Sequence, residues 1–216
     1  MKTDAQLKKD VESELEWDPA INAAHVGVMV ENGVVTLTGH LGTYGEKFLV
    51  ERAVQRVQGV RALALELDVK LAPSHQRSDS EIAAAAEDAL TWSAQVPAGI
   101  SLKVEQGWVT LKGDVEWEYQ RNAAARAVRS LKGVVGVSNS IVLRERPAHS
   151  NVETKIRDAL IRQAEKEAED IDVVIDGSEA TLRGTVRSWA ERAAAQAAAW
   201  SAVGVTSVVN ELKVAN

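Results

Sequence analysis

The residues of this chain best suited to acid–base catalysis or metal ligation are its histidines, because the sequence contains no cysteine. They are His25, His40, His75 and His149. A catalytic base or a metal ligand needs partners at a defined spacing, and these histidines stand at unrelated positions. We therefore expect all of them to be surface or turn residues, and we predict no catalytic residue, no cofactor and no metal site.

Carboxylates could instead hold a hard cation through their oxygens. One acidic stretch is dense enough to consider, and it comprises Glu165, Glu167, Glu169, Asp170 and Asp172. It lacks the glycine turn and the ligand order of a calcium-binding loop, so we interpret it as a solvated helix end. The alternative is a cation that tunes the last third of the chain.

Two glycine-rich segments invite comparison with loops that bind nucleotides or nucleic acids. Gly39-x-x-Gly42-x-x-Gly45 has the wrong spacing for a dinucleotide-binding loop, so a turn is the preferred interpretation. Gly133-Val-Val-Gly136 resembles the backbone clamp of an RNA-binding KH domain, but it lies where we expect a helix to end and a strand to begin.

An aromatic residue followed closely by a basic one recurs three times. The pairs are Tyr44 and Lys47, Trp117 and Arg121, and Trp189 and Arg192. Amphipathic rings beside cations suit a lipid headgroup region or a protein-binding hot spot, so these six residues are the predicted contact site. The alternative is that the rings pack within their own part of the chain, for example against Trp17 and Trp92.

The recurrence of these pairs reflects a repeat of the whole chain. A string of the type Gly-x-Val-Thr-Leu-x-Gly runs from Gly33 to Gly39 and from Gly107 to Gly113, and a variant one residue longer runs from Gly177 to Gly184. A Gly-Val pair followed by an alternating apolar run begins at Gly59, Gly133 and Gly204. The chain is therefore a triplication.

Each repeat predicts the order helix, strand, strand, helix, strand. The first helix begins at a capping box, predicted at Thr3, Ser78 and Ser150, and continues with apolar residues at every fourth position. Alternating apolar residues then indicate a hairpin around Asn32-Gly33, Gln106-Gly107 and Asp176-Gly177. We place the apolar stripe of the second helix on Leu49, Ala53 and Val57 and on their equivalents.

The predicted fold class is α/β, an α+β sandwich of three tandem αββαβ units spanning 1–71, 78–144 and 150–216. A helical crossover between the second and third strands should make those two parallel beside the antiparallel hairpin. Two helices can cover only one face of a three-stranded sheet, so we expect the other face to be solvated. The segments between units each contain a proline, which predicts semi-rigid connections.

Charge and hydropathy restrict the partners. The net charge is −6, and every repeat carries more acidic than basic residues, so nucleic acid is not an expected partner. No apolar run is long enough to span a membrane. The start of the chain lacks the apolar core of a secretion signal, so we expect a cytoplasmic location, or a periplasmic one if a leader was removed.

The repeated unit resembles the BON domain, a bacterial module named after osmotically induced and nodulation proteins. The resemblance rests on the hairpin from Gly107 to Gly113 and on the Gly-Val-x-x-Val-x-Asn-x-Leu type of strand that contains Asn139 and Asn210. The first copy departs from the pattern by placing Leu65 at the asparagine position. The resemblance implies two helices on a mixed three-stranded sheet, a non-enzymatic role, and binding to phospholipid surfaces or envelope partners.

Two functions remain open from the sequence. The first is a structural or adaptor protein that presents three related surfaces to a protein or polymeric partner, with avidity from their linkage. The second is a peripheral phospholipid-binding protein that uses the aromatic–basic pairs. Open strand edges also predict self-association.

Overall fold

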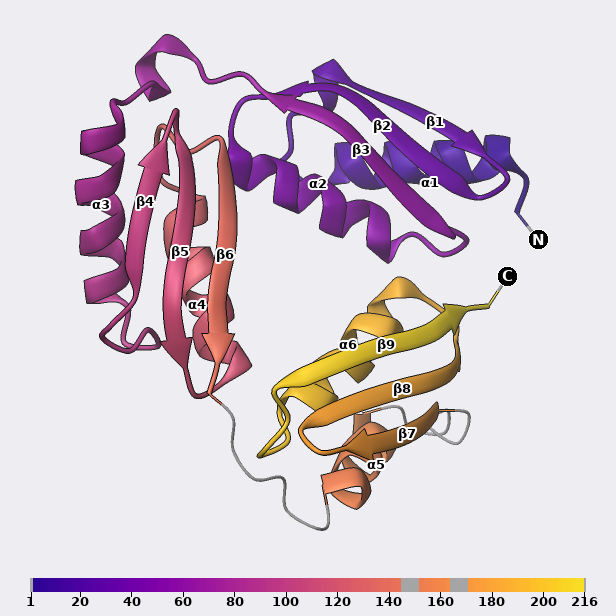
Figure 1. Ribbon diagram of the computed structural model, residues 1–216. Helices are drawn as coiled ribbons and strands as arrows, with labels where there is room; N and C mark the ends of the chain where they lie inside the picture. The colour runs from indigo at the N-terminus through magenta and orange to yellow at the C-terminus, as the bar shows by residue number, and fades with distance from the viewer. Residues whose placement is uncertain (1, 145–151, 164–170, 216) are drawn as a thin grey trace. The chain divides into compact units, whose positions relative to one another are not determined.

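The computed structural model describes residues 2–144, 152–163 and 171–215. The chain divides into two compact units, Lys2–Val142 and Leu143–Asn216. The first unit contains two of the sequence repeats and the second contains the third. Figure 1 shows the same arrangement of helices against a small sheet in each repeat.

Within the described residues, every repeat has two α-helices and three strands, which confirms the predicted order of elements. In repeat 1 they are α1 (Asp4–Trp17), β1 (Val26–Glu31), β2 (Val34–Leu41), α2 (Tyr44–Arg56) and β3 (Ala62–Val69). In repeat 2 they are α3 (Asp79–Trp92), β4 (Ser101–Glu105), β5 (Trp108–Val115), α4 (Glu118–Arg129) and β6 (Gly136–Leu143). In repeat 3 they are α5 (Val152–Gln163), β7 (Ile171–Asp176), β8 (Glu179–Val186), α6 (Trp189–Trp200) and β9 (Ser207–Val214). Short 3₁₀ turns, Ala23–His25 and Pro73–His75, precede β1 and α3.

The middle strand of each sheet is the second strand of its repeat. β1 pairs with β2 antiparallel, and β2 pairs with β3 in parallel; β7, β8 and β9 pair in the same way. The helix between the second and third strands provides the crossover that a parallel pair needs. Both helices of a repeat lie on one face of its sheet, as predicted (Figure 1).

The first helix of each repeat buries the apolar row that its sequence predicts. Leu7, Val11 and Leu15 are buried in α1, and the equivalent rows of α3 and α5 are buried as well. The second helix differs from its prediction, because Val50 and Val54 flank Ala53 in the core while Leu49 and Val57 are only half-buried. The buried row of α2 is thus shifted by one position, which its sequence permits because Leu49, Val50, Ala53, Val54 and Val57 provide more than one apolar row.

The hairpin turns also follow the prediction in two repeats and depart from it in the third. Asn32 and Gly33, like Gln106 and Gly107, have positive φ angles, as a two-residue turn of type I′ requires. In repeat 3, Asp176 pairs with Glu179 as the last strand residue, so Gly177 takes the first turn position. The extra residue of this copy therefore moves the glycine within the turn.

A carboxylate fastens the hairpin turn to the first helix, a contact that sequence reasoning missed. Asp4 accepts hydrogen bonds from the backbone N–H groups of Asn32 at 2.7 Å and Gly33 at 3.0 Å. Asp79 accepts from Gln106 and Gly107, both at 2.8 Å. Each aspartate is the first residue of its helix, where the helix dipole also favours a negative charge.

No helix in the described ranges combines the length and the apolar character that crossing a bilayer would require.

Candidate functional site

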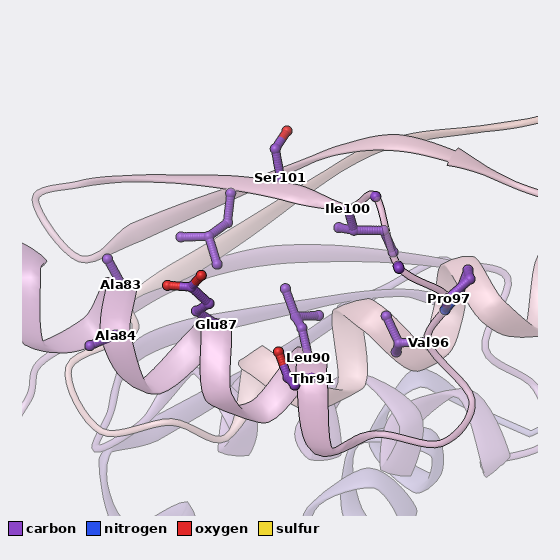
Figure 2. Close-up of a pocket in the computed structure, with 12 residues that line it drawn as sticks. Ala83, Ala84, Glu87, Leu90, Thr91, Val96, Pro97, Ile100 and Ser101 are labelled. Carbon is purple, nitrogen blue, oxygen red and sulfur yellow. The ribbon is translucent and has the colours of Figure 1, made fainter.

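A pocket of about 680 Å³ lies between α3 and the start of β4 in repeat 2. Leu90, Val96 and Ile100 supply apolar lining, and Glu87 is the charged residue among those labelled in Figure 2. The connection through Pro97 and the small side chains of α3 leave this space open beside an edge strand. The lining contains no nucleophile–base pair, so the pocket suits apolar contact rather than catalysis.

The predicted aromatic–basic site lies at the start of the second helix of each repeat. The third residue of that helix folds back onto the preceding loop in all three copies. Glu46 accepts from the N–H groups of Asn22 and Gly42, Gln120 accepts from Glu116 and Trp117, and Glu191 accepts from Arg187. These bonds satisfy loop donors and hold the corner in one conformation.

The cations of two corners point toward their own sheets. Lys47 donates through Nζ to the carbonyl of Leu67 at 2.7 Å. Arg192 donates to the carbonyl of the equivalent Leu212 at 3.1 Å and to that of Asn210 at 2.7 Å. Both side chains therefore fasten the second helix to the third strand.

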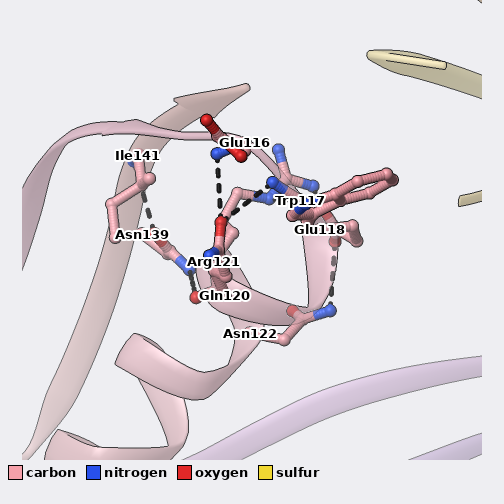
Figure 3. Close-up of polar contacts among 8 residues, drawn as sticks. All are labelled: Glu116, Trp117, Glu118, Gln120, Arg121, Asn122, Asn139 and Ile141. Atoms are coloured by element: carbon pink, nitrogen blue, oxygen red, sulfur yellow. Dashed lines mark hydrogen bonds and ion pairs between the residues drawn. The ribbon is translucent and has the colours of Figure 1, made fainter. Parts of the chain in front are cut away.

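The cation of the second corner pairs with a neighbouring carboxylate. Arg121 Nε lies 2.7 Å from Glu118 Oε2, and its guanidinium also donates to Oε1 of the same side chain at 2.9 Å (Figure 3). Only 12% of the Glu118 side chain is exposed, which strengthens the pair relative to a surface one. The charge of Arg121 is thus largely balanced within the repeat.

The asparagine of the family pattern also joins strand to helix. Asn139 donates to the carbonyl of Arg121 at 2.9 Å, and its own side-chain oxygen accepts from the N–H of Ile141 (Figure 3). Asn210 donates to the carbonyl of Arg192 at 3.3 Å in the same way. Repeat 1 carries Leu65 here and cannot form this bond.

The rings of the three corners are half-buried, and they do not pack against the tryptophans that end the first helices. Tyr44, Trp117 and Trp189 all have intermediate exposure, and the Arg192 guanidinium lies 5.2 Å from the Trp189 ring centroid. Trp17 and Trp92 instead face solvent, which excludes them as the partners considered from the sequence. That these corners contact a partner remains a prediction.

The most exposed aromatic side chains of the described residues are Trp17, at 84%, and Trp92, at 86%. They are the last residues of α1 and α3 and therefore occupy equivalent positions in repeats 1 and 2. The signal in the sequence was their matching distance from the capping boxes at Thr3 and Ser78. It did not reveal exposure, because tryptophan is usually largely buried.

The open faces of the sheets are less polar than predicted. Thr36 and Thr110 lie there as expected, but Met29 and Trp108 are exposed on the same faces. Trp108 lies against Gly136 on the neighbouring strand, where any Cβ would collide with the indole ring. Its Nε1 also donates to Ser138 at 2.9 Å, so this ring is held flat on its own sheet.

Two histidines that appeared unrelated in the sequence come together in repeat 1. The rings of His25 and His40 stack with centroids 4.6 Å apart and an interplanar angle of 13°. His75 lies in the 3₁₀ turn before α3, whereas His149 and the acidic residues 165, 167, 169 and 170 lie outside the described residues. Within those described, no group of three or more acidic or histidine side chains is placed to hold a metal ion.

These features define a class of protein: a tandem array of small α+β sandwiches whose repeated polar contacts maintain the scaffold. The family model of the BON domain matches residues 3–70, 78–145 and 149–216. The chain therefore belongs to the BON domain family, with three tandem copies. BON domains are binding modules and are in general non-enzymatic.

The solved structures similar to this chain include two from Chlamydia trachomatis. One is described as CdsD, a structural protein of the type III secretion system, with 17% identity, a TM-score of 0.26, and coverage of 96% of this chain and 91% of the other. The other is the C-terminal domain of CdsD, with 17% identity, a TM-score of 0.27 and full coverage of both chains. TM-scores this low support no functional inference. The search of curated proteins gave no match.

Proposed function

We propose that this protein is a non-enzymatic adaptor that binds a protein partner, with Trp17 and Trp92 as its anchoring side chains. The observation that carries the proposal is the near-complete exposure of both indoles at equivalent helix ends. An indole in water forgoes the stabilisation that its large apolar surface gains on burial. Tryptophan is also the residue type most enriched among interface side chains that dominate binding energy.

The charges around these anchors favour a protein over an anionic membrane. Glu14 lies three residues before Trp17 and Asp18 directly follows it, and Arg56 approaches both carboxylates, at 2.8 Å and 4.0 Å. The cations of the aromatic–basic corners are likewise engaged within their repeats. These cations are thus already bound by groups of the protein, whereas attraction to anionic lipid depends on lysine and arginine that are available at the surface.

A photo-crosslinking experiment tests the proposal directly. A photoreactive phenylalanine analogue would replace Trp17 or Trp92 in the full chain, and Tyr119 would serve as a matched exposed aromatic control on α4. We expect discrete protein adducts from positions 17 and 92. The control position 119 should yield none of these adducts. Equal adducts from all three positions would indicate non-specific contact and contradict the proposal.

Phospholipid binding is the competing function, and vesicle co-sedimentation separates the two. We expect the protein to remain in the supernatant with zwitterionic and with anionic vesicles at low salt. Sedimentation that is lost on replacing Tyr44, Trp117 and Trp189 by alanine would instead support lipid binding through the aromatic–basic corners.

A further inference from the structure

We propose that His25 and His40 form a binding site for one divalent transition-metal ion of the Zn²⁺, Ni²⁺ or Cu²⁺ type. The inference uses residues other than the proposed anchors and does not depend on the adaptor function. It rests on the close approach of two imidazoles, His25 at the end of the 3₁₀ turn before β1 and His40 on β2, with centroids 4.6 Å apart. Neutral imidazole is a preferred ligand for this group of ions.

The backbone brings the two histidines into opposition. Val26 pairs with Gly39 in the antiparallel register of β1 and β2, so the next pair outward is His25 and His40. Gly39 has a φ of 116°, and a Cβ there would collide with the carbonyl of His25. Glycine at this position therefore permits the close approach of the segment that carries His25.

The spacing of the rings suits two cis ligands of one ion. With metal–nitrogen distances of about 2.0 Å, two imidazole centroids lie about 4.5 Å apart for the right angle of square or octahedral Cu²⁺ and Ni²⁺ and about 5 Å apart for tetrahedral Zn²⁺. The stacked rings have a similar separation but lie nearly parallel, so binding requires both rings to rotate about their side-chain torsions until one nitrogen of each points to the ion. His25 is exposed and His40 is half-buried, so the ion can enter from solvent and keep water in its remaining positions.

The neighbouring strand adds a negative charge to the same face. His40 is in parallel register with Asp68 of β3, and residues in register on adjacent strands project from the same side of a sheet. The described residues place no third protein ligand within reach, so the site offers two protein ligands and open coordination positions. Such a site predicts reversible binding rather than the permanent retention of a structural metal.

The pair belongs to repeat 1 alone. The offset between repeats 1 and 2 places Gly99 and Asp114 at the equivalent positions, and repeat 3 has Thr185 in place of His40. The other repeats therefore cannot form this site, and the predicted stoichiometry is one ion per chain.

Calorimetric titration of the untagged full chain with ZnCl₂ and with NiCl₂, in a non-coordinating buffer, tests the site. We expect one ion per chain, with a loss of affinity of about tenfold or more in His25→Ala and in His40→Ala, because each removes one of two ligands. His75→Ala is the matched control and should bind as the original chain does. Circular dichroism of each variant would verify that it is folded.

Two results would overturn the proposal. One is the absence of measurable binding by the original chain at millimolar metal, and the other is unchanged affinity in the double variant His25→Ala/His40→Ala. Nitrogen chemical shifts of the imidazoles provide a second readout, since only the rings of His25 and His40 should change on addition of Zn²⁺.

Discussion

Arg192 shows at the scale of one residue how a side chain suited to partner binding is used within the fold. Its guanidinium donates to the carbonyls of Leu212 and Asn210 on β9, from the first turn of α6. We predict that Arg192→Ala lowers the protection of β9 amides in hydrogen exchange by about 2 kcal/mol, because it removes two hydrogen bonds from a charged donor.

Arg183→Ala is the matched control for this change. Arg183 lies on the central strand of the same sheet and pairs with Glu211 at 2.7 Å, but both side chains are about half exposed, at 57% and 50%. Exposed pairs stabilise proteins by about 0–1 kcal/mol, so β9 should retain nearly all its protection. Equal effects of the two substitutions would show that Arg192 has no special part in joining α6 to β9.

At the scale of an element, the capping boxes of α1 and α3 differ in one residue that changes their response to pH. Glu81 accepts from the Ser78 N–H at 2.8 Å in α3, whereas Gln6 accepts from the Thr3 N–H at 3.0 Å in α1. The backbone hydrogen bond from Ser78, followed by its hydroxyl, lowers the pKa of Glu81 below its usual value. A carboxyl with a lowered pKa stabilises the folded state above its unfolded pKa, and this contribution disappears as the pH falls through the folded pKa.

Glu81→Gln should therefore remove this pH dependence from α3. We predict that the urea midpoint of the original chain exceeds that of the variant by a constant amount near neutral pH. Below about pH 5 this advantage of the original chain should decrease, because Glu81 becomes protonated and the variant has no carboxyl there. Circular dichroism at a series of pH values would measure it, with Glu87→Gln on the exposed part of α3 as the control. A difference that stays constant down to about pH 3 would contradict the assigned role of the carboxylate.

The elements also show where sequence reasoning succeeded and where it failed. The row Leu7, Val11 and Leu15 was predictable because polar residues surround it, so only one face of α1 can enter the core. The second helices offer more than one apolar row, through alanines in α4 and α6 and through valines and Leu49 in α2, and packing against the sheet determines which row is buried. The stacking of His25 and His40 was not predictable because it depends on strand register, which pairs residues far apart in the sequence.

At the scale of the whole molecule, the three sequence repeats form two compact units. Within the unit Lys2–Val142, the Arg129 guanidinium of repeat 2 lies 3.6 Å from the centroid of the Phe48 ring in repeat 1. Burial there lowers the pKa of Arg129 from its usual value. This cation–π contact, together with the backbone of Ser130 near Gly45, joins α2 to the end of α4.

The loss of stability caused by equivalent core substitutions should therefore extend over different residues in the two units. Leu182 and Leu111 occupy the same position in repeats 3 and 2, and both are fully buried. Replacing either by alanine should cost about 2–5 kcal/mol through lost burial and a cavity. We predict that Leu182→Ala weakens hydrogen-exchange protection only within repeat 3, in residues 152–163 and 171–215, whereas Leu111→Ala weakens repeat 2 and also α2 of repeat 1. Loss of protection in α1 and α2 on Leu182→Ala would show that all three repeats unfold as one cooperative body, because the damage would then have crossed from one compact unit into the other.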